Sequence, residues 1–376
     1  MYPAPYPLHR PPQPAPGGNG LRKIPFALAE CSVLDQNGSG ENDYGDGATV
    51  AVDVAFVHKI EDVDVRPVSE WYRWVVQRDS PGTEPTVTKV GPSPGAYDFE
   101  TYVYCPAPWD LYDHMHVVRQ AHSLTISDRK YAADTDRFAP YVEEAAVDDI
   151  ELWRSSGPEA TETPTGFLTV LEPDLELYGK LYGSPSVEWE AGQSVPMPAF
   201  DAGFGSDEKD LEYGGARIKM DSSQSRFTAA TRWQQDVEDI SHHEFAHALV
   251  QPLEAEFSTG TESVRQWVVE GFAEWVALRF DTELASWRIE NNVSGQGFDG
   301  KLPDWDSDAT SASMGCTTSY LAFRFIAEKS GDAAALRFVT DHYRHPDQLD
   351  GQLREAVGMG ASEFEAAWAT YPRSHR

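Results

Sequence analysis

The chain is poor in cysteine: its three cysteines, Cys31, Cys105 and Cys316, lie far apart in 376 residues, and none belongs to a C-x-x-C pair. This number and spacing exclude a disulfide framework and a metal site made of thiolates alone. We expect three buried free thiols, with a Cys31–Cys105 disulfide as the alternative.

Long apolar segments are also lacking, because no stretch approaches the roughly 18 consecutive apolar residues of a membrane-spanning helix. Residues 1–20 contain seven prolines and three glycines but not the apolar core of a secretory signal. They are predicted to form a disordered, polyproline-like tail. We expect a cytoplasmic protein, unless the true start lies upstream of this chain.

Basic residues are few: 30 Lys and Arg stand against 61 Asp and Glu, which gives a net charge of −31. Such acidity repels phosphate backbones and anionic lipids, so we expect no nucleic-acid or membrane partner. Solubility or adaptation to salt is sufficient to account for it. Apolar residues still make up 40% of the chain and aromatic residues 12%, enough for a folded core in two or three domains.

The first part of the chain has the patterns of β-strands. Apolar residues alternate over 50–56 and again over 97–105, whereas residues 69–77, rich in Trp, Tyr and Val, predict a strand or a short helix. We therefore predict a small accessory module, β-rich or α+β, over residues 21–120.

The remaining chain, residues 121–376, is predicted to be mostly helical around a short sheet. We expect a helix over 128–154, strands over 166–171 and 216–220, and helices almost throughout after Phe227. Strands followed by many helices indicate an α+β fold rather than a doubly wound sheet.

The most informative motif is H-E-x-x-H at His243, Glu244 and His247. On a helix the two histidines lie one turn apart on one face, so both imidazoles can bind one Zn²⁺ ion. Glu244 follows the first histidine directly and can act as general base without binding the metal. The competing interpretation is two surface histidines beside an exposed glutamate.

A third metal ligand is available in the segment Trp267–Trp275. Glu270 follows His247 by 23 residues, far enough for a second helix to turn back against the first. Glu270 and Glu274 lie one turn apart on that helix, and two carboxylates among aromatic residues are costly to bury without a cation. We expect Glu270 to bind the zinc and Glu274 to accept a hydrogen bond from a ligand histidine. In the alternative, both carboxylates face water.

These residues resemble the gluzincin metallopeptidases, in which an H-E-x-x-H helix is followed by a zinc-binding glutamate. The likeness is greatest to the peptidase-MA-like domains of bacterial proteins and covers about residues 121–376. It includes a short strand before the zinc helix, at Gly214–Ile218, a helix led by Tyr320, and a small final helix over Gly358–Tyr371. The resemblance implies a zinc-dependent hydrolase that acts on a peptide or protein substrate.

The resemblance also implies that Tyr320 could donate its hydroxyl to the oxyanion formed during hydrolysis; packing between helices is the alternative. Two features differ from the classical aminopeptidases: the spacing to Glu270 is longer, and their Gly-x-Met-Glu-Asn strand motif is absent. Recognition of a substrate N-terminus is therefore not implied.

Other candidates are weaker. His242 points about 100° away from His243 around the helix and is not expected to bind the metal. His114 and His116 share a face if they lie on a strand, but no third ligand is apparent there, which favours a structural role. The edge of strand 216–220 could bind an extended peptide. Two alternatives to an enzyme stay open: an inactive gluzincin-like zinc protein that binds a partner, and a scaffold protein that acts through residues 21–120.

Overall fold

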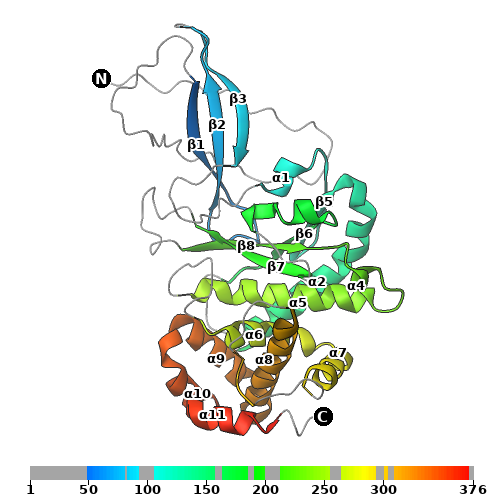
Figure 1. Cartoon of the computed structure of the whole chain (residues 1–376), viewed down its shortest axis with the longest axis vertical. Helices are drawn as coiled ribbons and strands as arrows, with labels where there is room; N and C mark the ends of the chain where they lie inside the picture. Colours follow the sequence, from blue (N-terminus) through cyan, green and yellow to red (C-terminus); the bar gives the residue numbers. More distant parts are fainter. Residues whose placement is uncertain are drawn as a thin grey trace.

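The computed structural model describes residues 49–80, 83–92, 106–156, 163–184, 190–199, 212–254, 264–293, 300–303 and 309–371. Within these ranges the fold is α+β, with two small sheets followed by a mostly helical C-terminal half, which confirms the predicted class (Figure 1). The predicted tail, the predicted strand 97–105, Cys31 and Cys105 lie outside the described residues. None of the described helices is both long and apolar enough to cross a membrane.

The N-terminal sheet is an antiparallel meander of three strands. Its strands are β1 (Thr49–His58), β2 (Val68–Gln77) and β3 (Thr86–Pro92), in that spatial order. The structure confirms the strand predicted over 50–56 and makes 69–77 a strand rather than a helix. This sheet stands above the rest of the molecule, with β1 and β2 ending close to the second sheet (Figure 1).

The second sheet has five strands in the order β4-β5-β6-β8-β7. They are β4 (Met115–Arg119), β5 (Ser123–Asp128), β6 (Phe167–Leu171), β7 (Gly192–Pro198) and β8 (Tyr213–Met220). The three central strands are parallel, and β4 and β7 are antiparallel to their neighbours.

One prediction about this sheet is wrong. Strand 216–220 is part of β8, which pairs with β6 on one side and with β7 on the other, so it offers no edge to a peptide. The edge strand next to β8 is β7, which the sequence did not indicate because prolines interrupt its pattern at Pro196 and Pro198.

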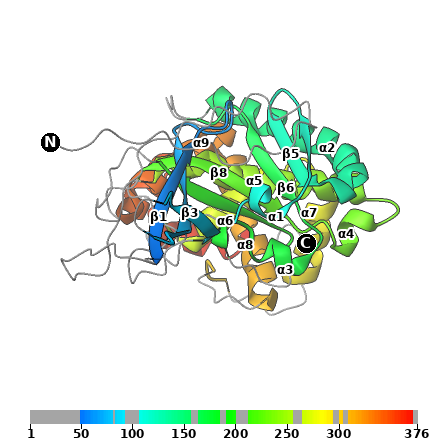
Figure 2. The same ribbon diagram turned by 90° about the horizontal axis from the view of Figure 1, so that it is seen from above.

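Helices alternate with the strands of the second sheet, and after β8 they make up the rest of the described chain. The longer ones are α2 (Ala132–Ser156), α5 (Trp233–Val250), α6 (Gln266–Leu278), α7 (Thr282–Arg288), α8 (Ala309–Ser330), α9 (Asp332–Arg344), α10 (Leu349–Val357) and α11 (Ala361–Trp368). Single turns form α1 (Pro108–Leu111), α3 (Leu175–Tyr178) and α4 (Ser225–Thr228). Helix α5 runs beneath the sheet, and α2 lies on the β5 side (Figures 1 and 2).

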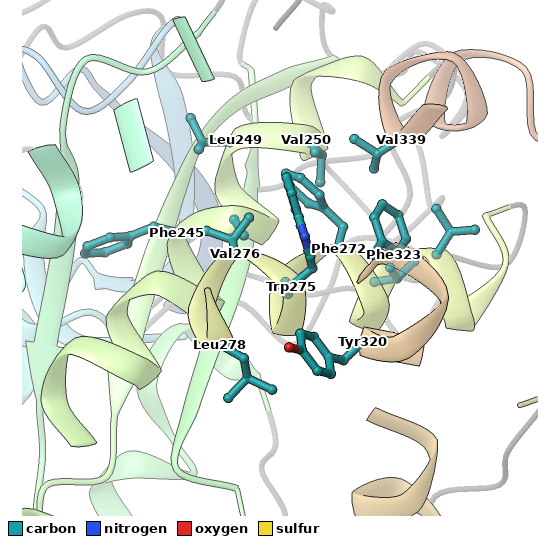
Figure 3. Close-up of a cluster of buried hydrophobic side chains, with 14 of the residues drawn as sticks. Phe245, Leu249, Val250, Phe272, Trp275, Val276, Leu278, Tyr320, Phe323 and Val339 are labelled. Carbon is teal, nitrogen blue, oxygen red and sulfur yellow. The ribbon is translucent and has the colours of Figure 1, made fainter. Parts of the chain in front are cut away.

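Two apolar clusters hold these layers together. The larger one joins the lower face of the sheet to the helices, and Figure 3 shows the part in which Phe272, Trp275 and Phe323 meet. The smaller one lies on the opposite face and joins Ile60 and Val63 of the β1–β2 connection and Val68 of β2 to residues of the five-stranded sheet.

The boundary predicted at residue 120 falls in the turn of the β4–β5 hairpin. Strand β4 therefore belongs to the five-stranded sheet rather than to the N-terminal module. The division of the chain into independent domains stays a prediction.

Candidate metal centre

Helix α5 carries the H-E-x-x-H motif in the centre of the molecule. Its two histidines, His243 and His247, lie on one face, with their Nε2 atoms 3.2 Å apart. Phe245 points from the helix toward the sheet and stacks on Phe167 of β6, with ring centroids 4.1 Å apart. This contact fixes the rotation of the helix, and α5 ends at Val250, just before Pro252 as predicted.

Helix α6 returns against α5 and brings Glu270 to the two histidines. The Glu270 Oε2 atom lies 3.4 Å from Nε2 of His243 and 4.0 Å from Nε2 of His247. The helix can lie close to α8 because Gly271 has no side chain: a Cβ atom there would meet the Ser319 carbonyl oxygen at 2.7 Å. The structure thus brings together the three predicted ligand residues, from two helices.

The geometry of this trio can be compared with that of a zinc site. Zinc bonds to imidazole nitrogen and carboxylate oxygen are about 2.0–2.2 Å long, so ligand atoms of a tetrahedral ion lie about 3.3 Å apart. The separations of 3.2, 3.4 and 4.0 Å are close to that spacing. Within the described residues this is the group of three side chains whose ligand atoms could hold a metal ion. Two imidazoles and one carboxylate suit zinc, although other divalent ions accept the same donors.

Glu274 lies on the Nδ1 side of the His243 ring, beyond hydrogen-bond distance, so the predicted hydrogen bond from a ligand histidine stays a prediction. Its Oε1 atom lies 3.8 Å from Nδ1 of His243, while its Oε2 atom accepts a hydrogen bond from Nη1 of Arg288 at the end of α7. Burial opposes the charge of Arg288, but the adjacent carboxylate outweighs this effect and raises the pKa of the guanidinium. Arg288 therefore keeps a positive charge against Glu274 and balances part of the acidity of the site.

Two further side chains hold Glu270 in place. Gln266, one turn earlier on α6, donates from Nε2 to Oε1 at 3.1 Å. The Cys316 thiol of α8 lies 3.9 Å from Oε2. Burial, together with the carboxylates of Glu270 and Glu274, raises the pKa of this thiol well above its usual value, so it stays protonated and can donate. No sequence pattern pointed to Arg288, Gln266 or Cys316, because their roles depend on how α6, α7 and α8 pack.

Glu244 lies beside the trio without belonging to it. Burial is the main cause that raises the pKa of its carboxyl to about 8, and the positive charge of His243 opposes the rise. The backbone N–H of Ser194, on the edge strand β7, donates to this carboxyl. Gly192 leaves room for it: a Cβ atom there would meet Cγ and Oε1 of Glu244 at 3.0 Å and Ile240 at 2.7 Å.

The two histidines of the trio differ in electrostatics. Burial lowers the pKa of both, but at His243 the bond to Glu270 and the charge of Glu244 outweigh it and raise the pKa to about 9. At His247 burial dominates and lowers the pKa to about 4. Without a metal ion, a proton on His243 neutralises part of the acidity, which means that the site attracts positive charge.

Tyr320 is buried in α8 (Figure 3). Its hydroxyl accepts a hydrogen bond from the Arg324 guanidinium. In the part of the chain that the structure describes, its side chain forms no hydrogen bond or ion pair with His243, His247 or Glu270. The oxyanion role implied for Tyr320 stays a prediction, and helix packing accounts for what is seen.

His242, His114 and His116 lie apart from the trio. His242 points away from the trio, binds Asp149 with 2.8 Å between Nδ1 and Oδ1, and stacks on Phe280. His116 binds Asp136 at 2.7 Å, and neither His114 nor His116 is part of a metal-binding group among the described residues. The structural role of His114 and His116 stays a prediction.

The chain was compared with known proteins. No model of a protein family matches it, and no curated protein is significantly similar to it. The likeness to gluzincins therefore depends on the motif residues and their geometry.

Proposed function

We propose that the protein is a zinc-dependent metallopeptidase that hydrolyses peptide bonds with Glu244 as general base. The observation that carries this proposal is the convergence of His243, His247 and Glu270 beside a buried Glu244 that is not one of the three converging side chains. A purely structural zinc site has four protein ligands, whereas a catalytic site has three and an open position. Three ligands with an adjacent base fit the catalytic kind.

His243, His247 and Glu270 would hold the ion, and Glu274 would orient the His243 ring by accepting from Nδ1. When bound, zinc supplies positive charge that acidifies water and polarises a peptide carbonyl. Glu244 takes the proton of the attacking water and passes it to the leaving nitrogen. The pKa of Glu244 is about 8 in the ion-free site, and a bound cation would lower it, which would favour the carboxylate that accepts the proton near neutral pH.

The edge strand β7 is the most favourable place for an extended substrate. The Ala191 carbonyl accepts from Asp221 and the Ala199 amide donates to Glu212, so odd-numbered residues of β7 turn their backbone groups toward β8. Gly192 and Ser194 turn theirs outward, on the side where Ser194 bonds to Glu244. A peptide beside this edge would lie next to the general base and would donate from its N–H groups to the outward carbonyl groups of Gly192 and Ser194, with little dependence on its sequence.

The decisive experiment compares Glu244→Gln with wild type in zinc content and in digestion of a broad peptide library followed by mass spectrometry. We expect about one zinc per chain in both proteins and a loss of hydrolysis of about 10²–10⁴-fold in the variant. Glu238→Gln, the same substitution on the same helix but away from the trio, is the matched control and should keep both properties. His243→Ala should lose the metal.

Each other outcome has a clear meaning. If Glu244→Gln loses zinc together with activity, Glu244 is a ligand and the proposed division of roles is wrong. If wild type binds zinc fully and cleaves nothing in the library, the inactive, partner-binding alternative replaces the peptidase. Absence of zinc after reconstitution would refute both.

A further inference from the structure

A second group of buried charges lies on the opposite face of the five-stranded sheet from the metal centre. It occupies the junction where the N-terminal sheet meets β8, and its members are at most 5% exposed: His58, Asp64, Glu70 and Arg217. The proposed metallopeptidase mechanism uses none of these side chains. Buried charges of this kind are costly unless they are neutralised, so their charge states can be worked out from their contacts.

Arg217 and Asp64 neutralise each other. Arg217 donates from Nη1 to Oδ1 of Asp64 at 2.5 Å and from Nη2 to Oδ2 at 3.0 Å, a two-pronged pair between β8 and the β1–β2 connection. Because the charge of Arg217 is already balanced by Asp64, the guanidinium cannot fully neutralise a second carboxylate such as Glu70.

His58 does not supply the missing positive charge. Its Nε2 atom lies 3.4 Å from Nη2 of Arg217, and a guanidinium can only donate, so Nε2 must present a lone pair. Burial, followed by the charge of Arg217, lowers the pKa of His58 to about 3, in agreement with a neutral ring.

Glu70 is thus left without a cation of its own. Its Oε1 atom lies 3.7 Å from Nε2 of His58. Its Oε2 atom accepts a hydrogen bond from Nε1 of Trp109 at 3.2 Å and lies 3.0 Å from the Tyr72 hydroxyl, which lies 2.7 Å from Oδ2 of Asp110. The Tyr72 hydroxyl has one proton to donate. We infer that it donates this proton to Asp110, because that contact is the shorter one and Asp110 is exposed. The Tyr72 oxygen can then accept from Glu70 only if Glu70 carries a proton.

We propose that Glu70 holds a proton in the folded protein, and that detachment of the N-terminal sheet from the five-stranded sheet releases this proton. In the closed state the Glu70 O–H bond points to the Tyr72 oxygen. On opening, that bond breaks, the proton passes to water or buffer, and the electron pair stays on a solvated carboxylate. The junction is therefore a pH-sensitive attachment.

The ionisation of Glu70 agrees with this arrangement. Burial is the largest cause that raises the pKa of its carboxyl to about 8, and the charge of Asp110 raises it further, whereas Arg217 and the hydrogen bonds with Tyr72 and Trp109 lower it. The groups that face it come from β1, the β1–β2 connection, β2, α1, the turn 181–183 and β8: His58, Asp64, Tyr72, Asp110, Tyr182 and Arg217. Because the pKa is raised in the closed state, the closed state is favoured most at low pH and loses stability as pH rises from about 4.5 to about 8.

Hydrogen–deuterium exchange on the whole protein tests the proposal. A suitable probe is the amide of Arg66 in the β1–β2 connection, which donates to the Gly214 carbonyl of β8 at 3.0 Å and so reports opening of the junction. Wild type is compared with Glu70→Gln at the same pH, which cancels the chemical exchange rate. Glu61→Gln, an exposed change on the same connection, is the matched control.

We compare the rate of hydrogen–deuterium exchange at the Arg66 amide in wild type with the rate in Glu70→Gln. The ratio of these two rates should rise about tenfold per pH unit between pH 6 and pH 8. Glu61→Gln should follow wild type throughout. A ratio that does not change with pH refutes the proposal, as does a rise of equal size in peptides from α6, which would indicate global unfolding.

A second variant tests the proposal without relying on how well a glutamine side chain packs at position 70. Tyr72→Phe removes the acceptor of the Glu70 proton and should speed exchange of the connection even at pH 6, where Glu70 is protonated. Unchanged exchange in Tyr72→Phe would show that the Tyr72 oxygen accepts no such proton, and it would overturn the assignment.

Discussion

The close packing of α6 on α8 at Gly271 leads to a quantitative prediction. In Gly271→Ala the new methyl group would lie 2.7 Å from the Ser319 carbonyl oxygen and 2.9 Å from Cδ2 of Phe323. Because the first of these atoms belongs to the backbone of a helix, it cannot rotate away, and the two helices must separate.

The expected magnitude combines two opposing effects. Overpacking of a tight core costs about 1–3 kcal/mol, and contact with a rigid carbonyl favours the upper part of that range. Replacing glycine by alanine within a helix stabilises the helix by about 1 kcal/mol. We therefore expect Gly271→Ala to lower the free energy of unfolding by about 1–2 kcal/mol.

Gly351 provides a matched control in α10. It is exposed, and a Cβ atom there would meet no atom within 4 Å, so Gly351→Ala should gain about 0.4–1 kcal/mol. Urea unfolding of the metal-free proteins, followed by circular dichroism, measures both values. Because Gly271 follows Glu270, the same variant should also bind zinc more weakly. Equal stabilisation by both substitutions would refute the packing argument.

Four further outcomes are expected. Glu274→Gln should keep the fold and weaken zinc binding by about 10–100-fold in a chelator competition, and unchanged affinity would remove Glu274 from the site. Arg288→Met should also weaken zinc binding, but in a Glu274→Gln background it should add little; additive effects would show that Arg288 does not act through Glu274. Tyr320→Phe distinguishes the two roles considered for Tyr320. A loss of hydrolysis of roughly 10²–10³-fold would support the oxyanion role, whereas the much smaller loss that we expect would indicate helix packing. Gly192→Ala should crowd Glu244 and lower kcat, while the zinc content, measured by elemental analysis, stays at the wild-type level. An unchanged kcat would mean that β7 can move to make room for the methyl group.

Much of the metal centre could be predicted from the sequence because helical geometry is local. Residues four apart share a face of any regular helix, so His243 and His247 had to lie together once α5 was recognised. Glu270 and Glu274 had the same relation on α6, and only the packing of the two helices remained to be inferred. Arg288 could not be found in this way, since its contact with Glu274 depends on where α7 turns.

The strands were harder to predict, for two physical reasons. β7 lacks an alternating pattern because Pro196 and Pro198 occupy positions whose backbone groups face outward, where no N–H is needed for pairing with β8. In β8, Arg217 and Lys219 alternate with apolar residues, a pattern that ordinarily indicates one face in water. Both are fully buried here, Arg217 by the β1–β2 connection and Lys219 by the carbonyl groups of Ser184 and Tyr178.

The same prolines have a consequence for how copies of the protein meet one another in solution. An open sheet edge with a continuous row of N–H groups is a template for strands of other molecules and a common origin of aggregation. Along β7 that row is interrupted at Pro196 and Pro198, and the N–H of Ser194 is already bonded to Glu244. A second copy therefore cannot add a full strand here, so the edge is protected against sheet-to-sheet polymerisation at high concentration.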